Sequence, residues 1–234
     1  MKDSKRVLVT GASRGIGRAC CDVLATQGIG VVSLSRSTPA DIPTTETHYR
    51  VDLEDFTETS ATIKQVLQSH SISGVICNAG RGDIGSLENF SVQQIQQSLA
   101  FNLISPMCIV RQCLPTLRKC KRSNIIFIGS TSALQGGRYG SIYSAAKFGL
   151  RGVAQALGYE VAGANCHVGI VHPGMVRTDF FDELDFEPGP EQAHALNAID
   201  VANAVLSMIQ APDNAVVSEL IVQPRQHVVQ KRKN

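Results

Sequence analysis

The chain has 234 residues, of which 43% are hydrophobic and 18% charged, and its formal net charge is +2. This balance is typical of a globular protein with one α/β domain over residues 1–234, and nothing in it indicates nucleic acid as a partner. No apolar run approaches the ~18 residues of a membrane span, so we expect a soluble, cytoplasmic protein without a membrane partner.

The cysteines and histidines do not indicate a metal site. The seven cysteines are scattered, with no Cys-x-x-Cys pair and no His/Cys cluster at metal-ligand spacing. We expect most of them to be small buried side chains, and we predict no bound metal.

The first predicted strand, residues 6–10, is followed at once by a glycine-rich turn and an amphipathic helix. The turn has the spacing G-x-x-x-G-x-G, at Gly11, Gly15 and Gly17. Glycines allow close approach of the backbone, and a helix start offers unpaired N–H groups to a pyrophosphate. The turn is not followed by Gly-Lys-Ser/Thr, which disfavours a mononucleotide P-loop and leaves a dinucleotide cradle.

The second predicted strand, residues 30–35, ends at Arg36. At this place in a dinucleotide-binding fold an acidic residue binds a free ribose 2′-hydroxyl, whereas an arginine accepts a 2′-phosphate. Arg14, inside the glycine turn, is a second candidate for that phosphate. We predict NADP(H) rather than NAD(H); the alternative is that both arginines are ordinary solvated side chains.

Polar residues also follow the next two predicted strands. A strand at residues 48–53 carries Asp52, which either accepts a hydrogen bond from an adenine amino group or caps the segment after it. A helix is expected at residues 57–70. The strand at residues 72–77 closes in Asn78-Ala79-Gly80, which is small and polar where a cofactor would pass.

Two helices are expected between the fourth and fifth strands. Ser91 is a favourable N-cap for the first, which carries Asn102 near its end. Pro106 is suited to the first turn of the second, which runs to about residue 117. The basic run 118–122 is read as a solvated helix end, not as a nucleic-acid site.

Three side chains in the second half of the chain form the candidate catalytic group. The apolar run 125–128 predicts a buried strand that delivers Ser130 at its carboxyl end. Tyr143 and Lys147 are four residues apart, on one face of a helix that continues to about residue 163. A cation beside a phenol lowers the pKa of the phenol, so Tyr143 can exchange a proton near neutral pH.

The sixth strand is expected at residues 166–171, followed by His172-Pro173-Gly174, with His172 as an ordinary loop histidine. Residues 175–198 show no strong regular pattern, but their phenylalanines predict an apolar substrate lid inserted in the domain.

The C-terminal part completes the pattern with a helix that opens at Asp200 and a seventh strand at residues 220–222. Residues 230–234 are expected to be frayed and exposed. Strands that alternate with helices throughout predict a Rossmann-like three-layer αβα sandwich around a mostly parallel, seven-stranded, doubly wound sheet. Ligands bind such sheets at the carboxyl ends of the strands, where the polar signals lie.

In this order and register, the motifs resemble the classical short-chain dehydrogenase/reductase family over nearly the whole chain. The resemblance implies a catalytic tetrad of Asn102, Ser130, Tyr143 and Lys147. It implies cofactor contacts from Gly11, Ser13, Arg14, Gly15, Ile16, Gly17, Arg36, Asp52, Leu53, Asn78, Ala79, Gly80, Tyr143, Lys147, Pro173, Gly174, Val176 and Thr178. The sequence departs from the family at Phe127 and Gly129, which replace a more usual polar residue and a serine.

The expected activity is NADP(H)-dependent interconversion of a carbonyl and a secondary alcohol, with a small-molecule substrate. Ser130 would donate a hydrogen bond to the carbonyl oxygen, and Tyr143 would act as general acid and base. The resemblance adds ribose binding by Lys147, a water held by Asn102, and a homodimer or homotetramer. The alternative is a catalytically idle NADP(H)-binding sensor or scaffold.

Overall fold

Runs of β-branched and aliphatic residues form the seven parallel strands of one sheet, because such side chains pack well on a pleated surface buried on both faces. The computed structural model describes residues 5–232. The strand order is β10-β6-β5-β4-β1-β2-β3. The bounds are β1 Arg6–Thr10, β2 Gly30–Ser35, β3 Glu46–Arg50, β4 Ile72–Cys77, β5 Ser123–Ile128, β6 Cys166–Pro173 and β10 Glu219–Val222.

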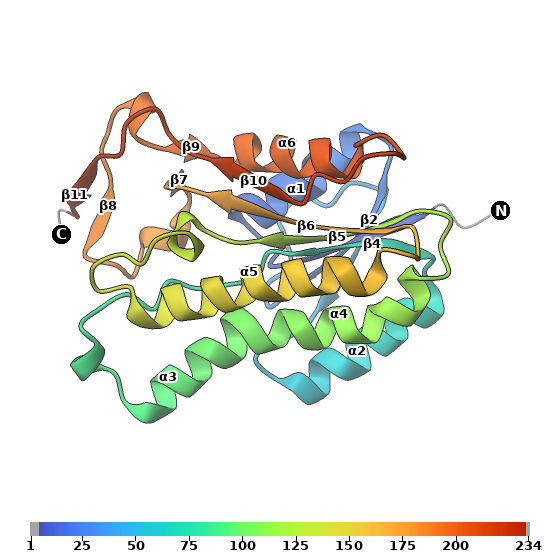
Figure 1. Ribbon diagram of the computed structural model, residues 1–234, viewed down its shortest axis with the longest axis horizontal. Coiled ribbons are helices and arrows are strands. Elements are labelled where there is room, and N and C mark those ends of the chain that lie inside the picture. The colour runs from blue at the N-terminus through green and yellow to red at the C-terminus, as the bar shows by residue number, and fades with distance from the viewer. Residues whose placement is uncertain (1–4, 233–234) are drawn as a thin grey trace.

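Helices cover both faces of this sheet (Figure 1). Helices α1 and α6 lie on one face, and α2, α4 and α5 lie on the other, where α3 leads into α4. The bounds are α1 Gly15–Thr26, α2 Phe56–Ser69, α3 Val92–Leu99, α4 Ser105–Leu117, α5 Ser141–Val161 and α6 Ala198–Ile209. The predicted three-layer αβα sandwich is therefore confirmed. Within residues 5–232, no helix is both long and apolar enough to cross a bilayer.

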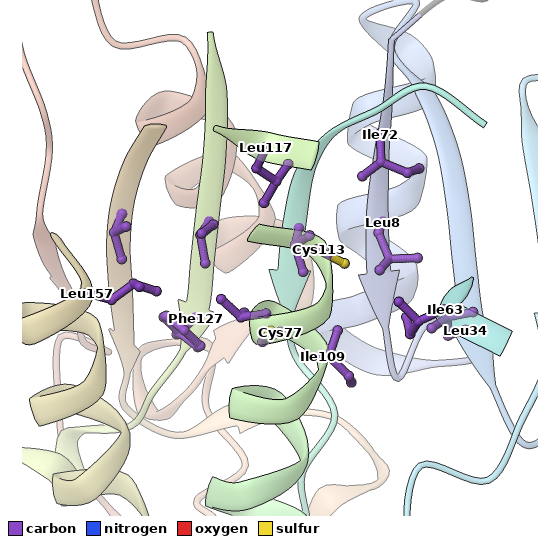
Figure 2. Packing of buried hydrophobic residues seen from close by; sticks show 14 of the residues in the cluster. Leu8, Leu34, Ile63, Ile72, Cys77, Ile109, Cys113, Leu117, Phe127 and Leu157 are labelled. Atoms are coloured by element: carbon purple, nitrogen blue, oxygen red, sulfur yellow. The ribbon is translucent and has the colours of Figure 1, made fainter. Parts of the chain in front are cut away.

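The hydrophobic core fixes the strand ends that carry the polar signals. Figure 2 shows part of the larger cluster, in which Leu8 and Phe127 of the sheet face Ile109 of α4 and Leu157 of α5. A second cluster lies between the sheet and the pair α1 and α6. Because both faces are densely packed, the strands hold a fixed register and their carboxyl ends form one rigid edge.

The connection between α3 and α4 differs from the prediction. Ser91 caps α3 as expected, in a capping box with Gln94. Pro106 lies in the first turn of α4, as predicted, but no loop separates the two helices, because the π-helical turn Ala100–Ile104 joins α3 to α4. Pro106 has no N–H to donate, and the change in hydrogen-bond spacing just before it lets the helix pass without a break.

The third strand also ends earlier than predicted. β3 stops at Arg50, two residues before Asp52. The chain turns there toward α2, whose N-cap is Asp55: its side chain accepts hydrogen bonds from the backbone N–H groups of Thr57 and Glu58. Asp52 therefore does not cap this helix.

Residues 175–198 contain short elements at the carboxyl edge of the sheet (Figure 1). β7 (Val176–Arg177) pairs with β9 (Leu196–Asn197). β8 (Phe186–Pro188) pairs antiparallel with β11 (Val229–Lys231), so the prediction of a frayed tail is wrong for this part. The tail is ordered because it satisfies the backbone groups of β8, which is otherwise an open edge. Residues 233 and 234 lie outside the described part of the chain.

Candidate functional site

The glycine turn between β1 and α1 is held in shape by the end of β4. The hydroxyl of Thr10 accepts hydrogen bonds from the backbone N–H groups of Asn78 (3.0 Å) and Ala79 (3.1 Å). The side-chain amide of Asn78 donates to the carbonyl oxygens of Thr10 (3.0 Å) and Gly11 (3.1 Å). Thr10 thus supports the turn, although its residue type alone gave no sign of this role.

All three glycines in the turn are required by its geometry, and Gly15 has φ +58°. Gly11 has φ +64°, in the left-handed region that favours glycine. A Cβ atom at Gly17 would overlap the carbonyl oxygen of Gly11. The first turn of α1 has no side-chain cap and no acidic residue, so its backbone N–H groups face the turn as free donors. Ser13, Gly15 and Ile16 are half-buried beside them.

The two arginines predicted to bind a 2′-phosphate lie in different surroundings. Arg36 is exposed directly after β2, and its carbonyl oxygen accepts a hydrogen bond from Arg50 (3.0 Å). Arg14 forms an exposed ion pair with Asp179 at 3.2 Å. Both side chains are exposed, but Arg14 is paired with Asp179, whereas no ion pair forms at the guanidinium of Arg36 among the described residues.

The residues that follow β3 are placed beside this region. Asp52 accepts a hydrogen bond from the backbone N–H of Glu54 at 3.0 Å. Leu53 is buried, and its carbonyl oxygen accepts a hydrogen bond from the hydroxyl of Ser105 at 3.0 Å. Asp52 therefore stabilises its own turn.

Lys147 brings three of the predicted catalytic elements together. It is buried on the same face of α5 as Tyr143, and its ammonium lies 5.6 Å from the centre of the Tyr143 ring. It donates a hydrogen bond to the carbonyl oxygen of Ile128 at 3.0 Å, at the end of β5. A Cβ atom at Gly80 would lie 3.0 Å from Oδ1 of Asn102 and 3.5 Å from Nζ of Lys147. Gly80, Asn102 and Lys147 therefore converge.

Asn102 lies in the π-helical turn and is almost fully buried. Its Oδ1 accepts a hydrogen bond from the backbone N–H of Arg81 at 3.0 Å, and its Nδ2 lies 3.5 Å from the hydroxyl of Ser98. The wide turn thus joins the end of β4 to the helix layer at the position of Lys147.

The protonation of the pair differs from the prediction. Burial raises the pKa of Tyr143 to about 12, and a hydrogen bond with the Ser130 side chain only partly opposes this rise. Burial also lowers the pKa of Lys147 to about 8. The expectation that the lysine lowers the phenol pKa below its usual value is not met, because burial of the phenol dominates and only the Ser130 hydrogen bond opposes it.

The segment after β6 closes over the glycine turn. Pro173 ends β6, and the backbone N–H of Gly174 donates to the carbonyl oxygen of Val222 at 2.8 Å. Val176 is buried in β7. A Cβ atom at Gly15 would lie 3.4 Å from the methyl carbon of Thr178. Pro173, Gly174 and Thr178 therefore connect the Ser130 side of the site to the glycine turn.

Phe180 lies directly against the candidate proton donor. Its ring centre is 5.9 Å from that of Tyr143, and its ring occupies the space where Gly82 lacks a side chain. Phe181 and Phe186 continue the aromatic contacts toward the tail. The predicted apolar character of residues 175–198 is thus present at the site itself.

The glycine turn, Tyr143, Lys147 and Asn102 lie at one edge of the sheet, and comparison with known proteins identifies the family of the chain. The model of the family described as short chain dehydrogenase matches residues 5–188. This chain belongs to the short-chain dehydrogenase family. The family prediction from the sequence is confirmed.

Relatives within the short-chain dehydrogenase family support an oxidoreductase that acts on alcohol or carbonyl groups. A 3-oxoacyl-[acyl-carrier-protein] reductase of Bos taurus is 28% identical, over 87% of this chain and 90% of that protein. Two solved structures share the fold, each with a TM-score of 0.83. One is the alcohol dehydrogenase of Thermococcus sibiricus with 5-hydroxy-NADP, 21% identical over 96% of this chain and 98% of the other. The second is a 3-ketoacyl-(acyl-carrier-protein) reductase of Brucella melitensis with NADH, 20% identical over 95% and 98%.

Proposed function

We propose that this short-chain dehydrogenase uses NADP(H) to interconvert a small-molecule carbonyl and a secondary alcohol, with Tyr143 as general acid and base. The observation that carries the proposal is the convergence of Tyr143, Lys147 and Asn102, with Ser130 hydrogen-bonded to the phenol, beside the glycine turn. Each residue comes from a different part of the chain or a different turn of α5. Apolar side chains at these positions would stabilise the fold at least as well as these buried polar and charged side chains, so stability alone does not explain why they lie together.

The residues at the carboxyl edge of the sheet fit a dinucleotide. The glycine turn offers free N–H groups at a helix start and leaves no room for side chains, as a pyrophosphate requires. Arg36 would bind the 2′-phosphate, Asp52 and Leu53 the adenine, and Asn78 to Gly80 the ribose side. Pro173, Gly174, Val176 and Thr178 would bind the nicotinamide carboxamide. When bound, the nicotinamide supplies or accepts the hydride.

The side chains of the site would then donate the proton to the carbonyl oxygen and stabilise the negative charge that develops on it. The Tyr143 phenol keeps its proton at neutral pH, because burial raises its pKa to about 12, and it donates that proton to the oxygen of a carbonyl during reduction. Ser130 donates a hydrogen bond to the same oxygen as negative charge develops there. Lys147, fixed by the Ile128 carbonyl, would bind the ribose and favour the phenolate after proton transfer. Asn102 would hold a water that connects Lys147 to solvent.

Arg36 makes the preference for NADP(H) testable. Replacing it with aspartate should raise the dissociation constant of NADPH by about 10- to 100-fold, because a charge-assisted hydrogen bond contributes roughly 1.5–3 kcal/mol. The same change should leave NADH binding equal or tighter, because a carboxylate accepts from a free 2′-hydroxyl. Fluorescence titration of both cofactors measures the two constants. Lys64→Asp on α2 is the control for charge, and an unchanged NADPH constant in Arg36→Asp would contradict the assignment.

The alternative, an idle NADP(H)-binding sensor or scaffold, would bind NADPH but would not oxidise it with any substrate. We expect steady oxidation of NADPH, followed by its absorbance, with at least one member of a panel of ketones, aldehydes and 3-oxoacyl thioesters. The reverse reaction is screened with alcohols and NADP+, and each assay is repeated with NADH or NAD+. Tight NADPH binding without turnover across the panel would favour the idle module.

We propose that the chain forms one domain and that residues 175–198 are a substrate lid within it.

We also propose that the protein is a homodimer or homotetramer. The outward faces of α4 and α5 expose Met107, Phe148 and, at 87%, Tyr159. Such a run of apolar side chains is suited to burial against a second copy. Light scattering after size exclusion should give at least a dimer, and Phe148→Lys should shift it toward monomer. A monomeric wild-type protein at micromolar concentration would contradict this assembly.

A further inference from the structure

His172 lies directly behind the candidate catalytic serine, where the sequence predicts an ordinary loop histidine. That prediction is wrong: His172 belongs to β6 and its side chain is fully buried. Its Nδ1 lies 3.0 Å from the carbonyl oxygen of Ser130. A carbonyl oxygen only accepts, so Nδ1 carries the hydrogen and donates it. A buried imidazole with a fixed tautomer therefore holds the backbone of Ser130.

Gly129 is what makes room for this imidazole. A Cβ atom at residue 129 would lie 2.5 Å from Nδ1 of His172 and 2.9 Å from its Cε1. Any other residue there would force the ring away from the Ser130 carbonyl. Glycine at position 129 and histidine at position 172 thus form a matched pair, and the unusual glycine before Ser130 has a physical reason.

The far side of the ring is supported by two charged residues from separate elements. Nε2 of His172 lies 2.8 Å from Oε1 of Glu219 in β10, and the same carboxylate pairs with Arg151 of α5 at 2.7 Å. Glu219 favours a proton on the ring, whereas burial lowers the pKa of His172. Both the imidazolium and the neutral Nδ1–H tautomer donate to the Ser130 carbonyl oxygen, whereas only the imidazolium carries a hydrogen on Nε2 that Glu219 can accept. The three elements that surround the ring fix its orientation.

Ser130 is consequently held from two sides. The backbone N–H of Ser132 donates to its Oγ at 3.1 Å, and its carbonyl oxygen accepts from the backbone N–H of Ala133 at 2.9 Å and from His172. The Ser130 hydroxyl donates its hydrogen to the Tyr143 phenol, and a substrate oxygen bound beside both groups would accept it instead. Displacing a reacting group by about 1 Å can reduce turnover about 100-fold, so the backbone support matters for rate.

We propose that His172 is a positioning residue that sets the Ser130 hydroxyl for catalysis through the Ser130 carbonyl oxygen, with Glu219 and Arg151 orienting the imidazole. The inference rests on the proposed function and adds residues to the same site. It places His172 outside contact with substrate or cofactor. Loss of the hydrogen bond to the Ser130 carbonyl oxygen should therefore lower the rate of the chemical step and leave the binding of NADPH unchanged.

Three substitutions separate the two contacts of the ring. His172→Asn can place an amide nitrogen near the position of Nδ1 and keep the bond to Ser130. His172→Gln reaches toward Glu219 and loses that bond, and His172→Leu loses both contacts. We expect kcat within about threefold of wild type for His172→Asn, and a decrease of about 10- to 100-fold for the other two. KM and the NADPH dissociation constant should change by less than about threefold. His167→Asn, at the opposite end of β6, is the control.

The dependence of alcohol oxidation on pH gives an apparent pKa that a loss of packing alone would not change. The hydrogen bond from Ser130 lowers the pKa of Tyr143. A displaced Ser130 should therefore raise the apparent pKa for alcohol oxidation in His172→Gln and His172→Leu, but not in His172→Asn. Thermal unfolding and circular dichroism show whether each variant folds. Equal loss in all three variants, or a changed KM without a changed kcat, would overturn the proposal.

Gly129→Ala tests the hydrogen bond between His172 and Ser130 without replacing the histidine. Its Cβ should push the ring from Ser130 and lower kcat, but it should have little further effect in a His172→Leu background, so the two changes would be non-additive. Additive effects would contradict the proposal. If the wild-type enzyme is active and the His172 variants have the same kcat, only this inference is refuted. A wild-type protein with no turnover at all refutes the proposed function instead.

Discussion

Replacing Tyr143 with phenylalanine should abolish carbonyl reduction while NADPH still binds. The ring is buried and packs against Phe180, so phenylalanine keeps the packing and removes only the hydroxyl. That hydroxyl is the proposed proton donor, and general acid catalysis contributes about 100- to 10,000-fold. Steady-state kinetics with an accepted carbonyl should show kcat reduced by that factor, with an NADPH dissociation constant close to that of wild type.

Tyr159→Phe supplies the matched control for this substitution. Tyr159 lies on the same helix, α5, and its side chain is 87% exposed, so the same chemical change should leave kcat unaltered. Full activity in Tyr143→Phe would mean that another group delivers the proton. The assignment of the phenol would then be wrong, whatever the cofactor preference.

Gly17→Ala should weaken cofactor binding more than any other single methyl group added to the chain. The new Cβ would overlap the Gly11 carbonyl oxygen and would lie 2.5 Å from the Asn78 amide that holds the turn. These atoms belong to the backbone and to a side chain tied to it, so relief requires movement of the turn. We expect a loss of stability of about 1–3 kcal/mol and a rise in the NADPH dissociation constant of about tenfold or more.

The control is Gly152→Ala, in the middle of α5, where a Cβ would meet no atom within 4 Å. Alanine is preferred over glycine inside a helix by roughly 0.5–1 kcal/mol, so this variant should be slightly more stable than wild type. Calorimetric melting and titration with NADPH measure both effects. Gly17→Ala with wild-type affinity would show that the turn does not hold the pyrophosphate.

The parts of the fold that were predictable are those with a local signal. The apolar runs at residues 6–10, 30–35 and 72–77 became β1, β2 and β4 with the expected bounds, because each run ends at a turn-forming residue. The spacing of Tyr143 and Lys147 fixed their common face on α5 without any knowledge of the fold. The carboxyl edge of a parallel sheet then brought Ser130 and the glycine turn to the same place.

The parts that were missed depend on contacts between distant segments. His172 looked like a loop residue because its partners, Gly129 and Glu219, are more than forty residues away along the chain. The tail strand β11 has no pattern of its own and forms because β8 presents an open edge. The raised pKa of Tyr143 follows from burial, which the spacing of charges in a sequence does not reveal.

Transfer of deuterium from NADPH that carries deuterium at both C4 positions of the nicotinamide tests whether this protein transfers a hydride to a carbonyl. The protein is incubated with the labelled cofactor and an accepted ketone, and the product is examined by mass spectrometry and NMR. We expect a secondary alcohol with one deuterium on the former carbonyl carbon, formed by the wild type and not by Tyr143→Phe. Alcohol without deuterium, or labelled NADPH that stays bound and unchanged with every carbonyl, would contradict this expectation.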